Sequence, residues 1–78
     1  MKVKDKLELE LISGRLKLLY AAESDDAIFD VCDHNGSICR SGIIEGEETV
    51  CDLTDISSGS YVVYIIDAGA IHTKSFKV

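Results

Sequence analysis

The chain has 78 residues, of which 46% are hydrophobic and 28% charged, and its formal net charge is −6. This length suits a single domain, which we place at residues 1–78. The composition is ordinary for a globular protein and too apolar for a disordered one. The acidic balance argues against nucleic acid and anionic membranes as partners, because both repel negative charge. The apolar runs are too short for a membrane span, so we expect no membrane insertion.

The first twenty residues predict a β-hairpin. Two segments flank Ser13-Gly14, and each alternates apolar with charged side chains, which is the period of a half-buried strand. A two-residue loop at Ser13-Gly14 places leucines opposite leucines on one side and Glu10 opposite Lys17 on the other. The alternative is a helix over residues 15–23, where some leucines also have helical spacing.

Five further strands are predicted downstream, at residues 27–33, 38–44, 49–53, 61–67 and 71–78. Polar or glycine-containing turns separate them, and the last of these turns is expected at Ala68-Gly69-Ala70. The spacing of the strands is typical of a sandwich or a small barrel. The predicted fold class is therefore all-β, a seven-stranded immunoglobulin-like antiparallel β-sandwich.

The turn around Asn35-Gly36 leaves two strand registers open. A two-residue loop places Cys32 opposite Cys39 and permits a disulfide, whereas a three-residue loop ending in a left-handed Gly36 places Val31 opposite Cys39. We favour the second, because it keeps Val31 and Cys39 on one apolar face. The chain has three cysteines and no C-x-x-C motif, so we expect free thiols acting as small hydrophobic side chains.

No group of residues in the sequence predicts catalysis. Cys32 and His34 share one side of a strand, but no third group orients the histidine and a flat sheet face offers no cleft. The acidic loops at Asp25-Asp26 and at residues 45–48 are interpreted as solvated charge rather than calcium ligands, and the turn at Gly36 does not fit an EF-hand. We therefore expect no enzyme activity, no cofactor and no metal site.

The outward side of segment 61–67 is unusually apolar. Alternate residues of this segment face the core, and the others point to where an ordinary solvated strand carries charges. Together with two residues of a neighbouring strand they form a candidate interaction face: Val62, Tyr64, Ile66, Ile28 and Cys32. The face predicts contact with another protein or with a second copy of the chain. The alternative is a strand shaded by the stems of neighbouring lysine and arginine side chains.

A recognisable pattern begins at Phe29. F-x-V-x-D-x-x-G-x-I-C is followed by C-D-L-x-x-I-x-x-G-x-Y-V-V, which starts at Cys51, and by K-S-F-K-V at the end of the chain. The pattern resembles small secreted immunoglobulin-like proteins of Bacteroidetes whose function is unknown. It is also similar to the C-terminal sorting domains of the type IX secretion system. Tyr61 occupies the position of a tyrosine corner, in which the hydroxyl bonds to the backbone a few residues upstream.

These observations predict a non-enzymatic interaction or accessory module. The alternatives are a C-terminal sorting domain of a secreted protein and a carbohydrate-binding module. Sugar platforms use exposed aromatic rings, and the chain has only three Tyr, two Phe and no Trp. The segment after Met1 alternates Leu with Glu and does not fit a signal peptide, which favours the cytoplasm. The resemblance instead implies a mature secreted or cell-surface fragment.

Overall fold

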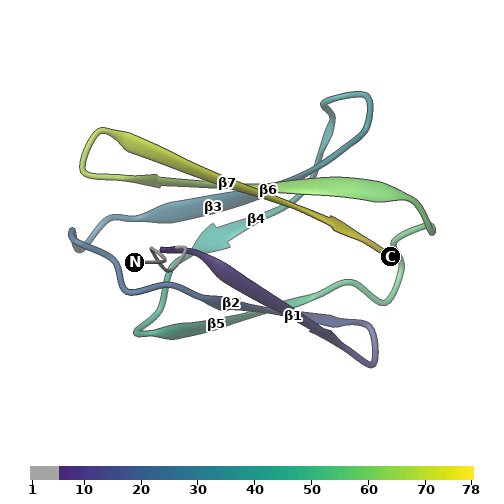
Figure 1. The fold of residues 1–78 in the computed structure, drawn as a ribbon, viewed down its shortest axis with the longest axis horizontal. Coiled ribbons are helices and arrows are strands. Elements are labelled where there is room, and N and C mark those ends of the chain that lie inside the picture. The colour runs from purple at the N-terminus through teal and green to yellow at the C-terminus, as the bar shows by residue number, and fades with distance from the viewer. Residues whose placement is uncertain (1–5) are drawn as a thin grey trace, which may run out of the picture.

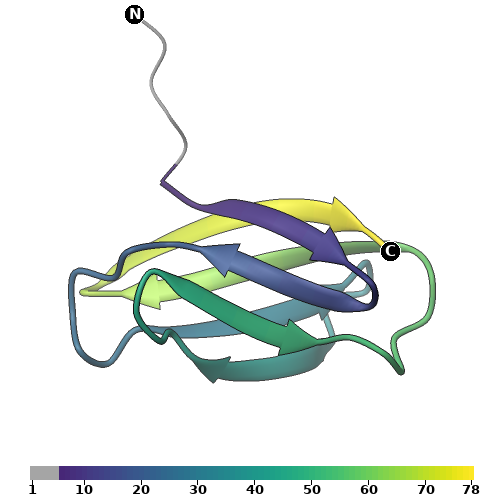
Figure 2. The same cartoon turned by 90° about the horizontal axis from the view of Figure 1, so that it is seen from below.

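The computed structural model describes residues 6–78, which form seven strands and no helix. In chain order the strands are β1 (Glu8–Ile12), β2 (Arg15–Leu19), β3 (Ile28–Asp33), β4 (Ile38–Ile43), β5 (Glu48–Asp52), β6 (Ser60–Asp67) and β7 (Ala70–Lys77). They form two antiparallel sheets, one in the order β1-β2-β5 and one in the order β4-β3-β6-β7. The two sheets form the two layers seen in Figure 1 and, from below, in Figure 2. The predicted seven-stranded sandwich is confirmed.

The fourth strand determines the width of the second sheet. In a constant-type immunoglobulin domain this strand joins the sheet of the first, second and fifth strands. Here β4 stays hydrogen-bonded to β3, because a short turn closes on the Asp33 side chain, whose Oδ1 accepts the N–H groups of Asn35 and Ser37 at 2.9 and 3.0 Å. The second sheet consequently has four strands and a broad outer face.

The N-terminal hairpin has the predicted register, with Leu9 opposite Leu18 and Glu10 opposite Lys17. Its two-residue loop has φ of 49° at Ser13 and 78° at the following glycine, as a type I′ turn requires. The alternative helix over residues 15–23 is wrong, because β2 lies between β1 and β5 and hydrogen-bonds to both. No helix of the described chain is long and apolar enough to cross a membrane.

The β3–β4 hairpin differs from both expected registers. Val31 pairs with Arg40 and Cys32 with Ile38, so Cys39 is the extra residue of a β-bulge. The favoured Val31–Cys39 pair is therefore wrong, and so is a direct Cys32–Cys39 pair. The three-residue loop does form, and the bulge then absorbs one residue and shifts the remaining ladder into the other register. Cys39 still packs against the core, and all three cysteines are free, as expected.

The core lies between the sheets, and its fully buried side chains are Leu16, Leu18, Val31, Val63 and Ile65. The inward side of β6 is as predicted, since Tyr61 is buried along with Val63 and Ile65. The Tyr61 hydroxyl donates to the Ser57 carbonyl at 2.6 Å, which confirms the tyrosine corner. One inward residue differs: Leu11 is exposed because β1 is an edge strand.

Gly42 lies where β4 crosses the ring of Phe29. The two residues are register partners, and a Cβ at Gly42 would come within 2.6 Å of Phe29 Cε1 and 2.8 Å of its Cζ. The ring is buried and has little room to move. We expect Gly42→Ala to lower the free energy of unfolding by about 1–3 kcal/mol, measured by chemical denaturation.

A double-mutant cycle with Phe29→Leu is the control for this prediction. Because leucine removes the ring atoms that the new methyl group meets, Gly42→Ala should cost clearly less in the Phe29→Leu background. Equal costs in both backgrounds would show that the ring does not limit this position.

Candidate interaction surface

The outer face of the four-stranded sheet carries a row of four isoleucines, one from each strand. The ladders pair Ile43 with Ile28, Ile28 with Ile66, and Ile66 with Ile71. Their exposed fractions run from 39% at Ile66 to 64% at Ile71. We call these four residues the isoleucine row. It crosses the full width of the sheet, so the apolar surface is continuous.

Two further rows cross the outer face, and the pair Ser60 and Lys77 of β6 and β7 lies at its end. The central row, in strand order β4-β3-β6-β7, contains Ser41, Asp30, Tyr64 and Thr73. The cysteine row, in the same order, contains Ile38, Cys32, Val62 and Ser75. In the central row the Ser41 hydroxyl donates to the Asp30 carboxylate at 2.7 Å. The one charged residue of the three rows thus lies between two largely apolar rows.

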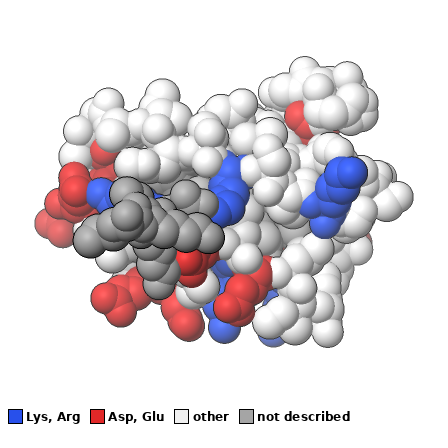
Figure 3. All heavy atoms as spheres, in the orientation of Figure 1, with Lys and Arg blue, Asp and Glu red and all other residues white. Residues whose placement is uncertain are grey.

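Charge separates this face from the opposite side of the sandwich. On the outer face of the three-stranded sheet six of the nine ladder positions are charged, namely Glu8, Glu10, Arg15, Lys17, Glu48 and Asp52, and the other three are Ile12, Leu19 and Val50. In the three rows defined above, Asp30 is the one charged residue, and none of them contains Lys or Arg. In Figure 3 the upper margin, above the four-stranded sheet, is accordingly mostly white, while charged side chains gather lower down.

Four of the five residues named from the sequence present surface on this face: Val62, Tyr64, Ile66 and Ile28. Cys32 points to the same side but is only 8% exposed, so it contributes little surface. The sequence analysis missed the exposed isoleucines of the two outer strands, Ile38, Ile43 and Ile71.

The missed residues follow from turn lengths. Ala68-Gly69 forms a two-residue loop with φ of 51° and 80°, and this places Ile66 opposite Ile71. The expected three-residue turn at Ala68-Gly69-Ala70 is wrong, because Ala70 already belongs to β7 and pairs with Asp67. A type I′ interpretation of the Ala-Gly pair would have identified Ile71 as a neighbour of Ile66.

Two of the cysteines, Cys32 and Cys51, show no sign of activation. Burial raises the pKa of Cys32 and also that of Cys51, so both thiols stay protonated at neutral pH. A reactive cysteine needs the opposite shift, towards the thiolate. Within residues 6–78 no group of three or more His, Cys, Asp or Glu side chains is arranged to hold a metal ion.

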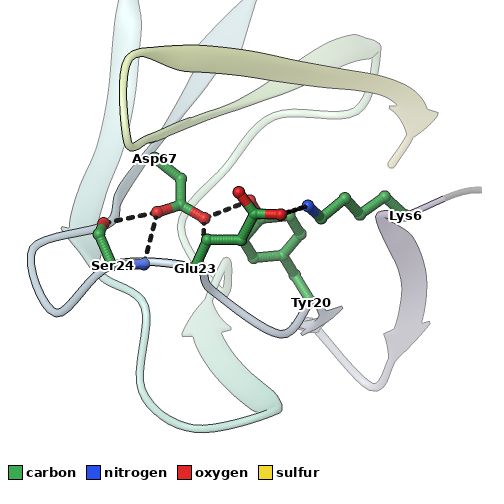
Figure 4. A network of polar contacts seen from close by, with 5 residues as sticks. All are labelled: Lys6, Tyr20, Glu23, Ser24 and Asp67. Carbon is green, nitrogen blue, oxygen red and sulfur yellow. Dashed lines mark hydrogen bonds and ion pairs between the residues drawn. The ribbon is translucent and has the colours of Figure 1, made fainter.

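Asp67 is a buried carboxylate at the end of β6, and Figure 4 shows its contacts. Its Oδ2 accepts the Tyr20 hydroxyl at 2.6 Å and the Glu23 N–H at 2.7 Å. Its Oδ1 accepts the N–H of Ser24 at 3.0 Å and the hydroxyl of Ser24 at 2.5 Å. Since Tyr20 directly follows β2, these bonds tie the end of one sheet to the other.

The hydrogen bonds to Asp67 also set the ionisation of this cluster. The Glu23 N–H, followed by the Ser24 and Tyr20 hydroxyls, lowers the pKa of Asp67 well below its usual range. Burial and the bond to Asp67 raise the pKa of Tyr20 to about 12. Nearby, the exposed Lys6 Nζ lies 2.7 Å from Glu23 Oε1. Because every donor is directed at the carboxylate, we interpret Asp67 as a structural group rather than a reactive one.

Comparisons with known proteins support the fold. One solved structure, a DUF3244 family protein with an immunoglobulin-like β-sandwich fold from Bacteroides vulgatus, is similar to this chain with a TM-score of 0.77 and 14% sequence identity. The match covers 95% of this chain and 84% of that protein. No family model and no curated protein matches the sequence. The similarity establishes an immunoglobulin-like sandwich, while the resemblance to sorting domains stays a prediction.

Replacing Asp67 with asparagine should weaken the link between the sheets. The amide keeps one acceptor oxygen and turns an NH₂ group towards N–H and O–H donors, so hydrogen bonds are lost. We expect Asp67→Asn to lower the melting temperature at pH 7 by about 5 °C or more. Asp25→Asn, at an exposed loop position, removes the same charge and is the matched control.

The loss of stability caused by Asp67→Asn should depend on pH in a defined direction. A carboxyl whose pKa is lowered by folding contributes stability above its unfolded pKa, which is about 3.9. That contribution is lost as the pH falls below this value towards the lower, folded-state pKa. The melting temperatures of the wild type and Asp67→Asn should therefore converge below about pH 4. A difference that stays constant from pH 7 to pH 3 would contradict the assignment.

Proposed function

We propose that this protein is a non-enzymatic, immunoglobulin-like interaction module whose binding surface is the outer face of the four-stranded sheet. The observation that carries the proposal is the isoleucine row, a line of exposed, β-branched side chains across all four strands. A solvated antiparallel sheet normally alternates apolar residues facing inward with polar residues facing outward. In the three-stranded sheet six of the nine outer ladder positions are charged, whereas every position of the isoleucine row in the four-stranded sheet is apolar.

The size of the surface supports the same interpretation. Four strands about 4.8 Å apart and five residues along each strand at about 3.3 Å give a footprint of roughly 300 Å². The largest apolar patch on a typical monomer covers about 300–600 Å² and is often functional. Burying such a patch is favourable at about 25 cal/mol per Å² of apolar area removed from water. The outer face is thus large enough to contribute to binding.

A sugar-binding function is less well supported. Stacking platforms need several exposed rings, whereas Tyr20, Tyr61 and Phe29 are buried in the core. Tyr64 is 37% exposed. It lies between Asp30 and Thr73 across the strands and between Val62 and Ile66 along β6. One partly exposed ring flanked by branched aliphatic side chains suits a protein surface better than a pyranose.

Site-specific photo-cross-linking tests the proposed surface. A benzoylphenylalanine residue replaces Ile66, and in the matched control it replaces Val50, an exposed residue on the outer face of the three-stranded sheet. Each protein is irradiated in an extract of the cells that encode it, and adducts are separated by mass. We expect discrete adducts from position 66 and a much weaker, diffuse pattern from position 50.

Two outcomes would contradict the proposed function. The first is the absence of a discrete adduct from position 66, and the second is the same adducts from both positions in similar yield. Either result would show that the outer face of the four-stranded sheet is not a preferred contact surface.

A further inference from the structure

We infer that the outer face binds a second copy of this chain, around a two-fold axis that runs along the strands between β3 and β6. This inference rests on the proposed function and names its partner. Such an axis exchanges β3 with β6 and β4 with β7 of the opposing copy. Each of the three rows then lies on the same row of the second copy, in reverse strand order.

The reversed rows are chemically complementary. In the isoleucine row, Ile28 lies over Ile66 of the second copy and Ile43 over Ile71 of the second copy, so apolar surface covers apolar surface. In the cysteine row, Cys32 lies over Val62 of the second copy. The interface is isologous, so each of these contacts occurs twice.

The central row supplies the polar contact. Asp30 comes to lie opposite Tyr64 of the second copy, whose hydroxyl can donate to the carboxylate. Packed sheets are about 10 Å apart, a gap that a long tyrosine and a short aspartate side chain span together. A shallow hollow beside Asp30, lined in part by Cys32, Ile38 and Tyr64, receives the incoming ring. Asp30 already accepts a hydrogen bond from Ser41, so its carboxylate has partners when the face is covered.

The alternative two-fold axis is disfavoured by charge. An axis running across the strands through the central row would place Asp30 on Asp30 of the second copy. Two carboxylates would then face each other in a water-poor interface, which is costly. The axis along the strands separates them and gives each a tyrosine hydroxyl instead.

Area and net charge set the strength of the dimer. The footprint of roughly 300 Å² is well below the approximately 800 Å² per partner of a standard interface, so we expect a weak complex with Kd between about 10 µM and 1 mM. Each copy also carries a formal net charge of −6. Added salt screens the repulsion between copies, so the dimer should tighten as ionic strength rises.

Sedimentation equilibrium of the purified protein from 0.02 to 2 mM tests the inference. We expect the average mass to rise from 8.5 kDa towards twice that value, and to rise further in 0.5 M NaCl. Tyr64→Phe removes only the hydroxyl and should weaken the dimer about fivefold or more. Tyr64→Lys and Ile71→Lys should abolish it, and Val50→Lys on the opposite sheet should leave it unchanged. Circular dichroism checks that each variant is folded.

Different outcomes would contradict the proposed dimer and the proposed interaction function. A wild-type protein that stays monomeric at 2 mM overturns the second copy as partner, as does a dimer that survives both lysine substitutions on the face. A position-66 adduct in extract with a mass other than that of two copies also overturns the inference, but leaves the proposed interaction function standing.

Discussion

The antiparallel ladder between β3 and β6 is the constraint on which both sides of the four-stranded sheet depend. These are the two central strands of that sheet, and Val31 pairs with Val63 in the core. Because side chains alternate with a period of two, the same register places Ile28 beside Ile66 on the outside. A slip of β3 by one residue would expose Val31 and bury Ile28 together with Asp30. Core and outer surface are therefore two results of one pairing.

Much of the fold could be predicted from the alternation of apolar and polar residues alone, because a strand that is buried on one side has apolar residues at every second position. The β1–β2 register and the inward side of β6 follow from it, whereas the tyrosine corner at Tyr61 was expected from the resemblance to immunoglobulin-like domains. The bulge at Cys39 could not be predicted this way, since an extra residue leaves the hydrophobic pattern of the hairpin unchanged on either side. The direction of the Cys39 side chain is set by the pairing of the whole β3–β4 ladder rather than by the neighbours of Cys39 in the sequence.

The candidate surface was predicted only in part for the same reason. Its central residues lie on β3 and β6, whose own alternation identifies them. The contributions of β4 and β7 depend on which residue comes opposite which, and hence on the bulge and on the length of the Ala68-Gly69 turn. Asp67 is a different case, because it occupies an inward position of β6 after Ile65. A charged residue at such a position signals a satisfied buried carboxylate, although its donors, Tyr20 and Ser24, come from a distant segment.

One register of the β3–β6 ladder buries the valines and exposes the isoleucines. Methyl NMR with a soluble gadolinium chelate, at protein concentrations low enough for a monomer, tests it most directly. We expect strong relaxation enhancement for the methyl groups of Ile28, Ile66 and Ile71, and weak enhancement for those of Val31 and Val63. Similar enhancement of both sets, or the reverse order, would contradict it.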